Sequence, residues 1–120
     1  MDWDPLFFGA DATTLNDAPL GDEKLTIVGK MWRDDIDERT RMRAYAWRPF
    51  DKENPTTVLG TFGGYHSEAL DVNGEGHVVG WADTRKHGPQ AFLYSDGQMT
   101  NLNSVVDVGQ IELEYANAIN

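Results

Sequence analysis

Apolar and polar residues alternate with a period of two along much of the chain, and glycine-containing turns interrupt the alternation. The clearest case is segment 25–32, whose odd-numbered residues share one face of a strand: Leu25, Ile27, Gly29 and Met31. Short apolar runs at 78–81 and 91–94 are typical of strands that are partly buried on both faces. No stretch shows the period of a helix. The pattern predicts an all-β fold of antiparallel strands.

Two dipeptides mark tight hairpin turns in the second half of the chain. Asn73-Gly74 and Asp96-Gly97 both favour a type I′ turn, because that turn requires positive φ at its central residues. With these turns in place, the second half is expected to form four antiparallel strands, at residues 66–72, 76–82, 90–95 and 98–103.

Three segments share the pattern Ala-x-x-(Leu/Val/Ile)-Asn, at residues 12–16, 69–73 and 116–120. Further matches follow in the same order: Ile27-Val28-Gly29 corresponds to Val78-Val79-Gly80, and Arg43–Trp47 corresponds to Gln90–Tyr94. Such spacings lie in the range of propeller blades. We interpret the chain as a single domain, 1–120, with repeat units at about 12–62 and 63–110 and the start of a third at 111–120.

Three segments carry a resemblance to a known family: Leu59-Gly60-Thr61-Phe62-Gly63-Gly64, Gly76-His77-Val78-Val79-Gly80 and Ala91-Phe92-Leu93-Tyr94. They resemble the HAF repeat, which is named after a His-Ala-Phe triplet and occurs as tandem units in bacterial proteins. The resemblance covers residues 12–120 and implies propeller-like blades and an extracellular location. Arg43 and Gln90 stand where the family's His would precede Ala, so that signature position is absent. The family has no established activity, so the resemblance leaves function open.

Two units are few for such an array, because each repeat buries its apolar faces against its neighbours. The last strand, expected at about 112–119, has no following strand in the chain to pair with. We expect it to pair with another copy of the chain, which would make the protein a homo-oligomer through its edge strands. The alternatives are closure onto the segment near 25–31, or a chain that is a fragment of a longer array.

The composition excludes several classes of partner. With 20 acidic and 10 basic residues, the net charge of −10 argues against nucleic acid and against anionic membrane surfaces. The absence of cysteine excludes disulfides, thiolate metal sites and Cys nucleophiles. The N-terminus lacks a basic segment followed by an apolar run, and no window is apolar enough to span a membrane. The chain as given is therefore expected to be soluble and without a signal peptide.

Five side chains are candidates for binding a ligand or partner: Trp32, Arg33, Arg43, His66 and Trp81. Trp32, Trp47, Trp81 and Tyr94 occupy related strand positions, where aromatic residues form either core or a stacking surface for a sugar or peptide. The segment between Arg33 and Arg43 carries four arginines among four acids. It is interpreted either as a solvated loop with self-neutralising charge or as a partner-binding loop.

The sequence offers no catalytic or metal constellation. His66 and Ser67 are expected to point apart on one strand, and no Gly-x-Ser-x-Gly turn is present, so His66 is expected to satisfy a loop carbonyl. The histidines lack metal-binding spacing. Segment 71–76 resembles the first half of a calcium loop, but the position of the closing Glu falls on Ala82, so a hairpin is expected instead. No metal or cofactor is predicted.

These observations favour a non-enzymatic binding or interaction module that uses loops at one end of the units to hold a protein or a carbohydrate. The alternative is a small hydrolase or carbohydrate-active enzyme whose site assembles at an oligomer interface. An enzyme requires convergent His or acidic side chains in a concave site, whereas a binding module requires an accessible aromatic or arginine surface.

Overall fold

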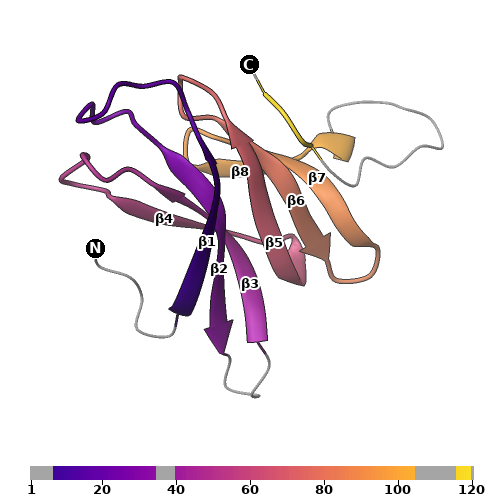
Figure 1. Ribbon diagram of the computed structural model, residues 1–120. Coiled ribbons are helices and arrows are strands. Elements are labelled where there is room, and N and C mark those ends of the chain that lie inside the picture. The colour runs from indigo at the N-terminus through magenta and orange to yellow at the C-terminus, as the bar shows by residue number, and fades with distance from the viewer. Residues whose placement is uncertain (1–6, 35–39, 105–115, 120) are drawn as a thin grey trace.

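The computed structural model describes residues 7–34, 40–104 and 116–119. Within these ranges the chain forms eight strands in two four-stranded antiparallel sheets and no α-helix, which confirms the all-β prediction (Figure 1). The first sheet consists of β1 (Phe7–Leu15), β2 (Ile27–Asp34), β3 (Thr40–Trp47) and β4 (Thr56–Gly60). The second consists of β5 (Gly63–Val72), β6 (Val78–Thr84), β7 (Gly88–Ser95) and β8 (Gln98–Asn101), followed by a 3-10 turn at Leu102–Ser104.

Within each sheet, every strand pairs with the next strand in the chain, so both sheets are meanders. The four strands expected in the second half are all present, with shifted ends. The chain passes from the first sheet to the second between Gly60 and Gly63, whose φ angles are 89° and 102°. Glycine adopts these angles without the steric cost that a side chain would add.

The first two strands of each sheet pair in matching register. Ala12 pairs with Gly29 and Ala69 pairs with Gly80, and in both sheets the register then shifts by one residue. A Cβ at Gly29 would collide with the carbonyl oxygen of Asp11, and a Cβ at Gly80 would collide with the corresponding oxygen of Glu68. Both positions therefore need glycine for the close approach of the neighbouring backbone.

The aromatic residues match less completely than expected. Trp47 pairs with Ile27 and Tyr94 pairs with Val78, which are equivalent positions in the two sheets. Trp81 directly follows Gly80, whereas the residue that directly follows Gly29 in the first sheet is Lys30. Trp32 and Trp81 therefore do not occupy equivalent positions. The expectation of a common strand position is confirmed for Trp47 and Tyr94 and is wrong for Trp32 and Trp81.

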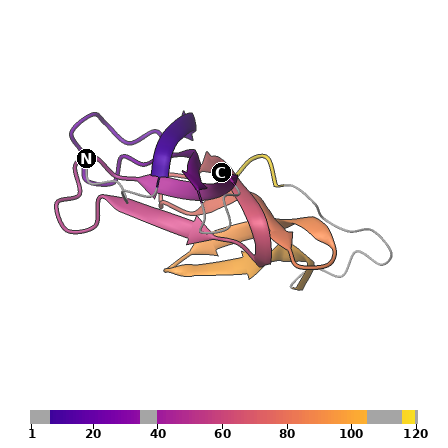
Figure 2. The same cartoon turned by 90° about the horizontal axis from the view of Figure 1, so that it is seen from below.

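The two sheets lie as two layers with an apolar core between them (Figure 2). Its buried members come from both sheets: Val28, Ala44, Ala46, Leu59, Ala69, Val72, Val78, Ala82 and Phe92. Val28 lies one position before Gly29, whereas Val78 lies two positions before Gly80. Because side chains alternate across a strand, the two matching sheets contribute opposite faces to this core.

Only one of the two expected hairpin turns is of the predicted type. Asp96 and Gly97 have φ angles of 52° and 80°, as a type I′ turn requires. In the turn after β5, the positive φ of 83° falls on Gly76 instead of on Asn73 or Gly74. The type I′ prediction for Asn73-Gly74 is therefore wrong, because the Asn73 side chain folds the loop by binding its backbone amides.

The described end of the chain contacts the second sheet. The amide of Ala116 donates to the carbonyl oxygen of Gly80 at 3.2 Å, and the amide of Ile119 donates to Asp71 Oδ2 at 2.9 Å. These contacts differ from the expected closure onto the segment near 25–31. The rest of the expected strand at 112–119 lies outside the described residues.

Replacing Gly80 by Ala is expected to lower the free energy of unfolding by about 2 kcal/mol, because the methyl group forces β5 and β6 apart. Gly74→Ala is the matched control: its Cβ would meet nothing within 4 Å, and we expect a change within about 0.5 kcal/mol. Urea unfolding of both variants measures the difference, and equal effects would contradict the close-approach argument.

Tyr45 is a buried tyrosine whose phenolic hydroxyl has a raised pKa. Burial is the main cause and the charge of Asp11 is the second, and the ordinary pKa is 10.0. Its hydroxyl donates to the backbone carbonyl oxygen of Asp11 at 3.1 Å. The folded state therefore holds the phenolic proton more tightly than the unfolded chain, so its contribution to stability is present below the ordinary pKa and is lost as pH rises above it.

Tyr45→Phe is expected to cost about 1 kcal/mol of unfolding free energy at neutral pH, because the hydrogen bond to Asp11 is lost. Above pH 10 the difference between wild type and variant should shrink, because only the wild type pays a penalty for ionising this ring. Urea unfolding across the alkaline range measures it. Tyr65→Phe, at a half-exposed position, is the matched control.

Candidate functional site

Three strand-connecting loops, at residues 16–26, 48–55 and 73–77, gather at one end of the molecule (Figure 1). They enclose an open cavity of about 750 Å³, a volume suited to a small ligand. The lining residues come from all three loops: Glu23, Lys24, Thr26, Arg48, Phe50, Asp51, Lys52, Glu53, Asn54, Gly74, Glu75 and Gly76. The cavity therefore depends on both sheets.

Asn16 closes the first of these loops. Its backbone amide donates to the Thr26 carbonyl oxygen, and its Oδ1 accepts from the Thr26 amide, both at 3.1 Å. Its Nδ2 donates to the carbonyl oxygen of Lys24 at 3.0 Å. Asn16 is only 2% exposed, so these bonds satisfy polar atoms that water does not reach.

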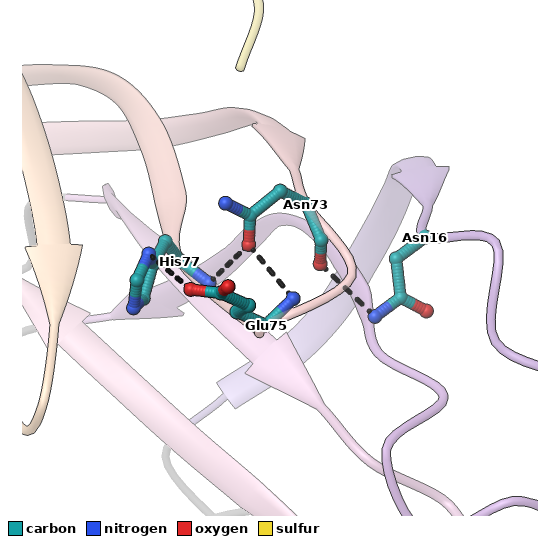
Figure 3. Close-up of polar contacts among 4 residues, drawn as sticks. All are labelled: Asn16, Asn73, Glu75 and His77. Atoms are coloured by element: carbon teal, nitrogen blue, oxygen red, sulfur yellow. Dashed lines mark hydrogen bonds and ion pairs between the residues drawn. The ribbon is translucent and has the colours of Figure 1, made fainter. Parts of the chain in front are cut away.

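Asn73 closes the third loop in the same manner (Figure 3). Its backbone amide donates to the His77 carbonyl oxygen at 3.0 Å. Its side-chain Oδ1 accepts from the backbone amides of Glu75 at 3.0 Å and His77 at 2.9 Å. Asn16 Nδ2 also donates to the Asn73 carbonyl oxygen at 3.2 Å. This bond joins the two loops and sets one wall of the cavity against the other.

Asp51 folds the second loop. Its Oδ1 accepts from the amides of Glu53 at 3.0 Å and Asn54 at 3.1 Å. The base of the loop is closed by a 2.7 Å bond from the Arg48 amide to the Pro55 carbonyl oxygen. The loop that carries the exposed ring of Phe50 is thus ordered by its own hydrogen bonds.

Arg48 reaches from the second loop across to the other two. Its Nε donates to Thr26 Oγ1 at 3.3 Å, and that buried hydroxyl donates in turn to the Lys24 carbonyl oxygen at 2.9 Å. The guanidinium passes over Gly76, where a Cβ would lie 2.8 Å from Nη2. Gly76 therefore provides the space that the guanidinium occupies.

Charge of both signs lines the cavity. Three cationic side chains face four acidic ones, and the cations are Lys24, Arg48 and Lys52. Glu75 Oε2 lies 3.7 Å from His77 Nδ1, so this acid is engaged when the imidazole is protonated (Figure 3). A polar ligand with hydroxyl groups and one charge, together with a ring face for Phe50, fits such a lining.

The residues singled out from the sequence do not line this cavity. Trp32 pairs with Met42, whose amide donates to His66 Nδ1 at 3.1 Å, and Arg43 donates to the carbonyl oxygen of Tyr65. The structure thus brings Trp32, Arg43 and His66 to the junction of β2, β3 and β5. Arg33 lies in β2, and its side chain is outside the described part of the structure.

Trp81 is connected to the first sheet through Glu68. Its Nε1 donates to Glu68 Oε1 at 3.1 Å, and Glu68 Oε2 lies 3.4 Å from Lys30 Nζ. Lys30 Nζ lies 5.9 Å from the ring centroid of Trp32. Both tryptophans therefore belong to a polar link between the sheets.

His66 and Ser67 do not point apart, contrary to the expected alternation. Ser67 Oγ accepts a hydrogen bond from the Ala44 amide at 2.8 Å. His66 Nδ1 accepts one from the Met42 amide, which lies two residues earlier in the same strand. The reason is an irregularity in β5 between Gly63 and Ser67, which breaks the two-residue period. The expectation that His66 satisfies a carbonyl is also wrong at Nδ1, which accepts from an amide.

The loop 48–55 was missed by the sequence analysis. The loop reads Arg-Pro-Phe-Asp-Lys-Glu-Asn-Pro, so an aromatic residue stands beside charged residues between two prolines. That aromatic residue distinguishes it from a purely polar loop and could have marked it as a candidate site. The recurring asparagines at 16 and 73 were recognised as part of a pattern, but their capping role requires the structure. The contact between them spans 57 residues of sequence.

Within the described ranges, no group of three or more His, Cys, Asp or Glu side chains is arranged to hold a metal ion. The oxygens of the calcium-like segment have other partners: Asp71 Oδ2 accepts from Ile119 and Asn73 Oδ1 accepts from its own loop. Over the same residues, no helix has the length and apolar character needed to cross a membrane.

Comparisons with protein-family models, with curated proteins and with solved structures give no match to this chain.

Asn16→Asp is expected to lower the free energy of unfolding by about 2 kcal/mol, because the carbonyl oxygens of Lys24 and Asn73 lose their donor and face a carboxylate. The control is Asn54→Asp at an exposed position of the cavity rim, where a change within about 0.5 kcal/mol is expected. Thermal or urea unfolding measures both. A neutral Asn16→Asp would mean that the bond between the loops contributes little.

Proposed function

We propose that the chain is a non-enzymatic binding module whose ligand occupies the cavity between loops 16–26, 48–55 and 73–77. One observation carries this proposal: three loops from two sheets, each folded by an Asn or Asp side chain, surround an open space of about 750 Å³, and a bond from Asn16 to Asn73 joins two of them. Ordered walls favour binding, because little conformational entropy is lost when a ligand enters.

The surroundings of Ser67 support binding over hydrolysis. Ser67 is fully buried, and its oxygen accepts from the Ala44 amide, so it is not placed to attack a substrate. His66 Nδ1 is engaged with the Met42 amide instead of with the serine. A hydrolase built on this pair would need both contacts to be broken.

We also propose that each sheet is one propeller-like unit of the HAF-type repeat. Support comes from the matching pairs Ala12–Gly29 and Ala69–Gly80, and from the use of opposite faces at the sheet–sheet core. When two sheets pack through unlike faces, each keeps one face that its neighbour does not cover. A third sheet can then pack in the same way, so the arrangement does not end with two units. Such stacking allows further units, including those of a second copy, to continue the array on the outer faces of the sheets.

The binding proposal is tested by titrating the protein, labelled with nitrogen-15, with neutral and acidic oligosaccharides and with short peptides. A ligand should shift the backbone amide resonances of the three loops, and Phe50→Ala should weaken its binding roughly tenfold through loss of ring contact. Val58→Ala, an equally exposed apolar position outside the cavity, should leave affinity unchanged. Shifts confined to the surroundings of Trp32 and Trp81 would overturn this location, and sedimentation of the same samples tests self-association.

A further inference from the structure

The guanidinium of Arg48 is held through Nε, and Nη2 lies against Gly76. Nε is fixed by Thr26 Oγ1, which is itself buried and bonded to the Lys24 carbonyl oxygen. Gly76 leaves room for Nη2 beside the backbone of the third loop. This arrangement orients the planar fork before any ligand arrives, so less side-chain entropy is lost on binding.

No acidic side chain of the described residues lies within ion-pair distance of Arg48. Among the described residues, the ion pairs join Lys30 to Glu68 and His77 to Glu75, and Arg48 bonds through its side chain to Thr26 only. Asp51 Oδ1 is used by the amides of its own loop. Arg48 therefore lines the cavity with a positioned guanidinium that has no carboxylate of the described residues as a partner.

We propose that Arg48 binds the carboxylate of a uronic-acid residue in an oligosaccharide, an inference that rests on the proposed function of the cavity. A guanidinium fork matches the two oxygens of a carboxylate in a bidentate pair. The exposed ring of Phe50 offers a surface for the sugar ring, and the acids of the rim accept hydrogen bonds from sugar hydroxyls.

A saccharide fits better than the carboxylate end of a peptide. Peptide termini are typically captured by free backbone amides that form a nest. The loop amides here already donate to side chains: Thr26 to Asn16, Glu53 to Asp51, and Glu75 to Asn73. The net charge of −10 also repels a polyanion at long range, which favours a short ligand with few charges.

The test compares trigalacturonate with its fully methyl-esterified form, which keeps the rings and removes the charges. Calorimetry should show that the wild type binds the acid at least tenfold more tightly than the ester. Arg48→Gln should bring this ratio close to one. Lys86→Gln, a cation in the turn after β6 and away from the cavity, should keep the wild-type ratio.

A second variant separates recognition from folding. Thr26→Val removes the hydroxyl that positions Arg48 while its bulk is retained, and it should reduce the acid-to-ester ratio severalfold. Thermal unfolding identifies any variant that is not folded. If Arg48→Gln does not fold, the acid-to-ester affinity ratio is measured in Thr26→Val and in Arg48→Lys, which loses the planar fork. A lower ratio than in the wild type supports the inference, and an unchanged ratio overturns it.

Each outcome decides for or against the inference. Equal binding of acid and ester by the wild type, with shifts of the loop amides, would overturn the role of Arg48 and leave the cavity as a binding site. No response of the loop amides to saccharides or peptides would overturn both proposals. Shifts of the loop amides with inorganic phosphate, and none with any saccharide, would show a general anion site and would also overturn the inference.

Discussion

Two hydrogen bonds from the backbone of β3 to side chains of β5 hold the first sheet against the second. Strand β4 pairs with β3 only as far as Ala44, so the amides of Ala44 and Met42 find other partners. Ser67 Oγ accepts from Ala44, and His66 Nδ1 accepts from Met42. A buried amide without a partner costs about 1–3 kcal/mol, so the irregularity in β5 that directs both side chains to one edge is required by the fold.

The apolar core lies at the same contact between the two sheets. Neither four-stranded sheet covers its own faces, and the buried cluster takes small and large residues from both, such as Ala44 and Leu59 from the first and Ala82 and Phe92 from the second. The link from Lys30 through Glu68 to Trp81 reinforces the same junction. The charged and aromatic residues there thus stabilise the contact between sheets, which is why they are not available in the loop cavity.

The cavity is a consequence of the same packing. When the two sheets stack, their hairpin loops are brought to one end, and Asn16 bonds to the carbonyl oxygen of Asn73. The loop that begins at Arg48 then closes the third side. The proposed binding function therefore depends on sheet packing as much as on the loops themselves, and a change in the core should alter the site.

The sequence by itself determined the strand character, the turn at Asp96–Gly97 and the recurrence of the segments at 12 and 69, because alternation and turn preferences act over a few neighbouring residues. Local rules failed at His66 and at Asn73-Gly74, where a strand irregularity and a capping side chain replaced the expected geometry. Only the tertiary structure decided that Arg48 lies beside Thr26 and Gly76, which are more than twenty residues away on either side. Such a site is made by the stacking of two sheets, and no periodicity in the chain specifies which loops that stacking brings together.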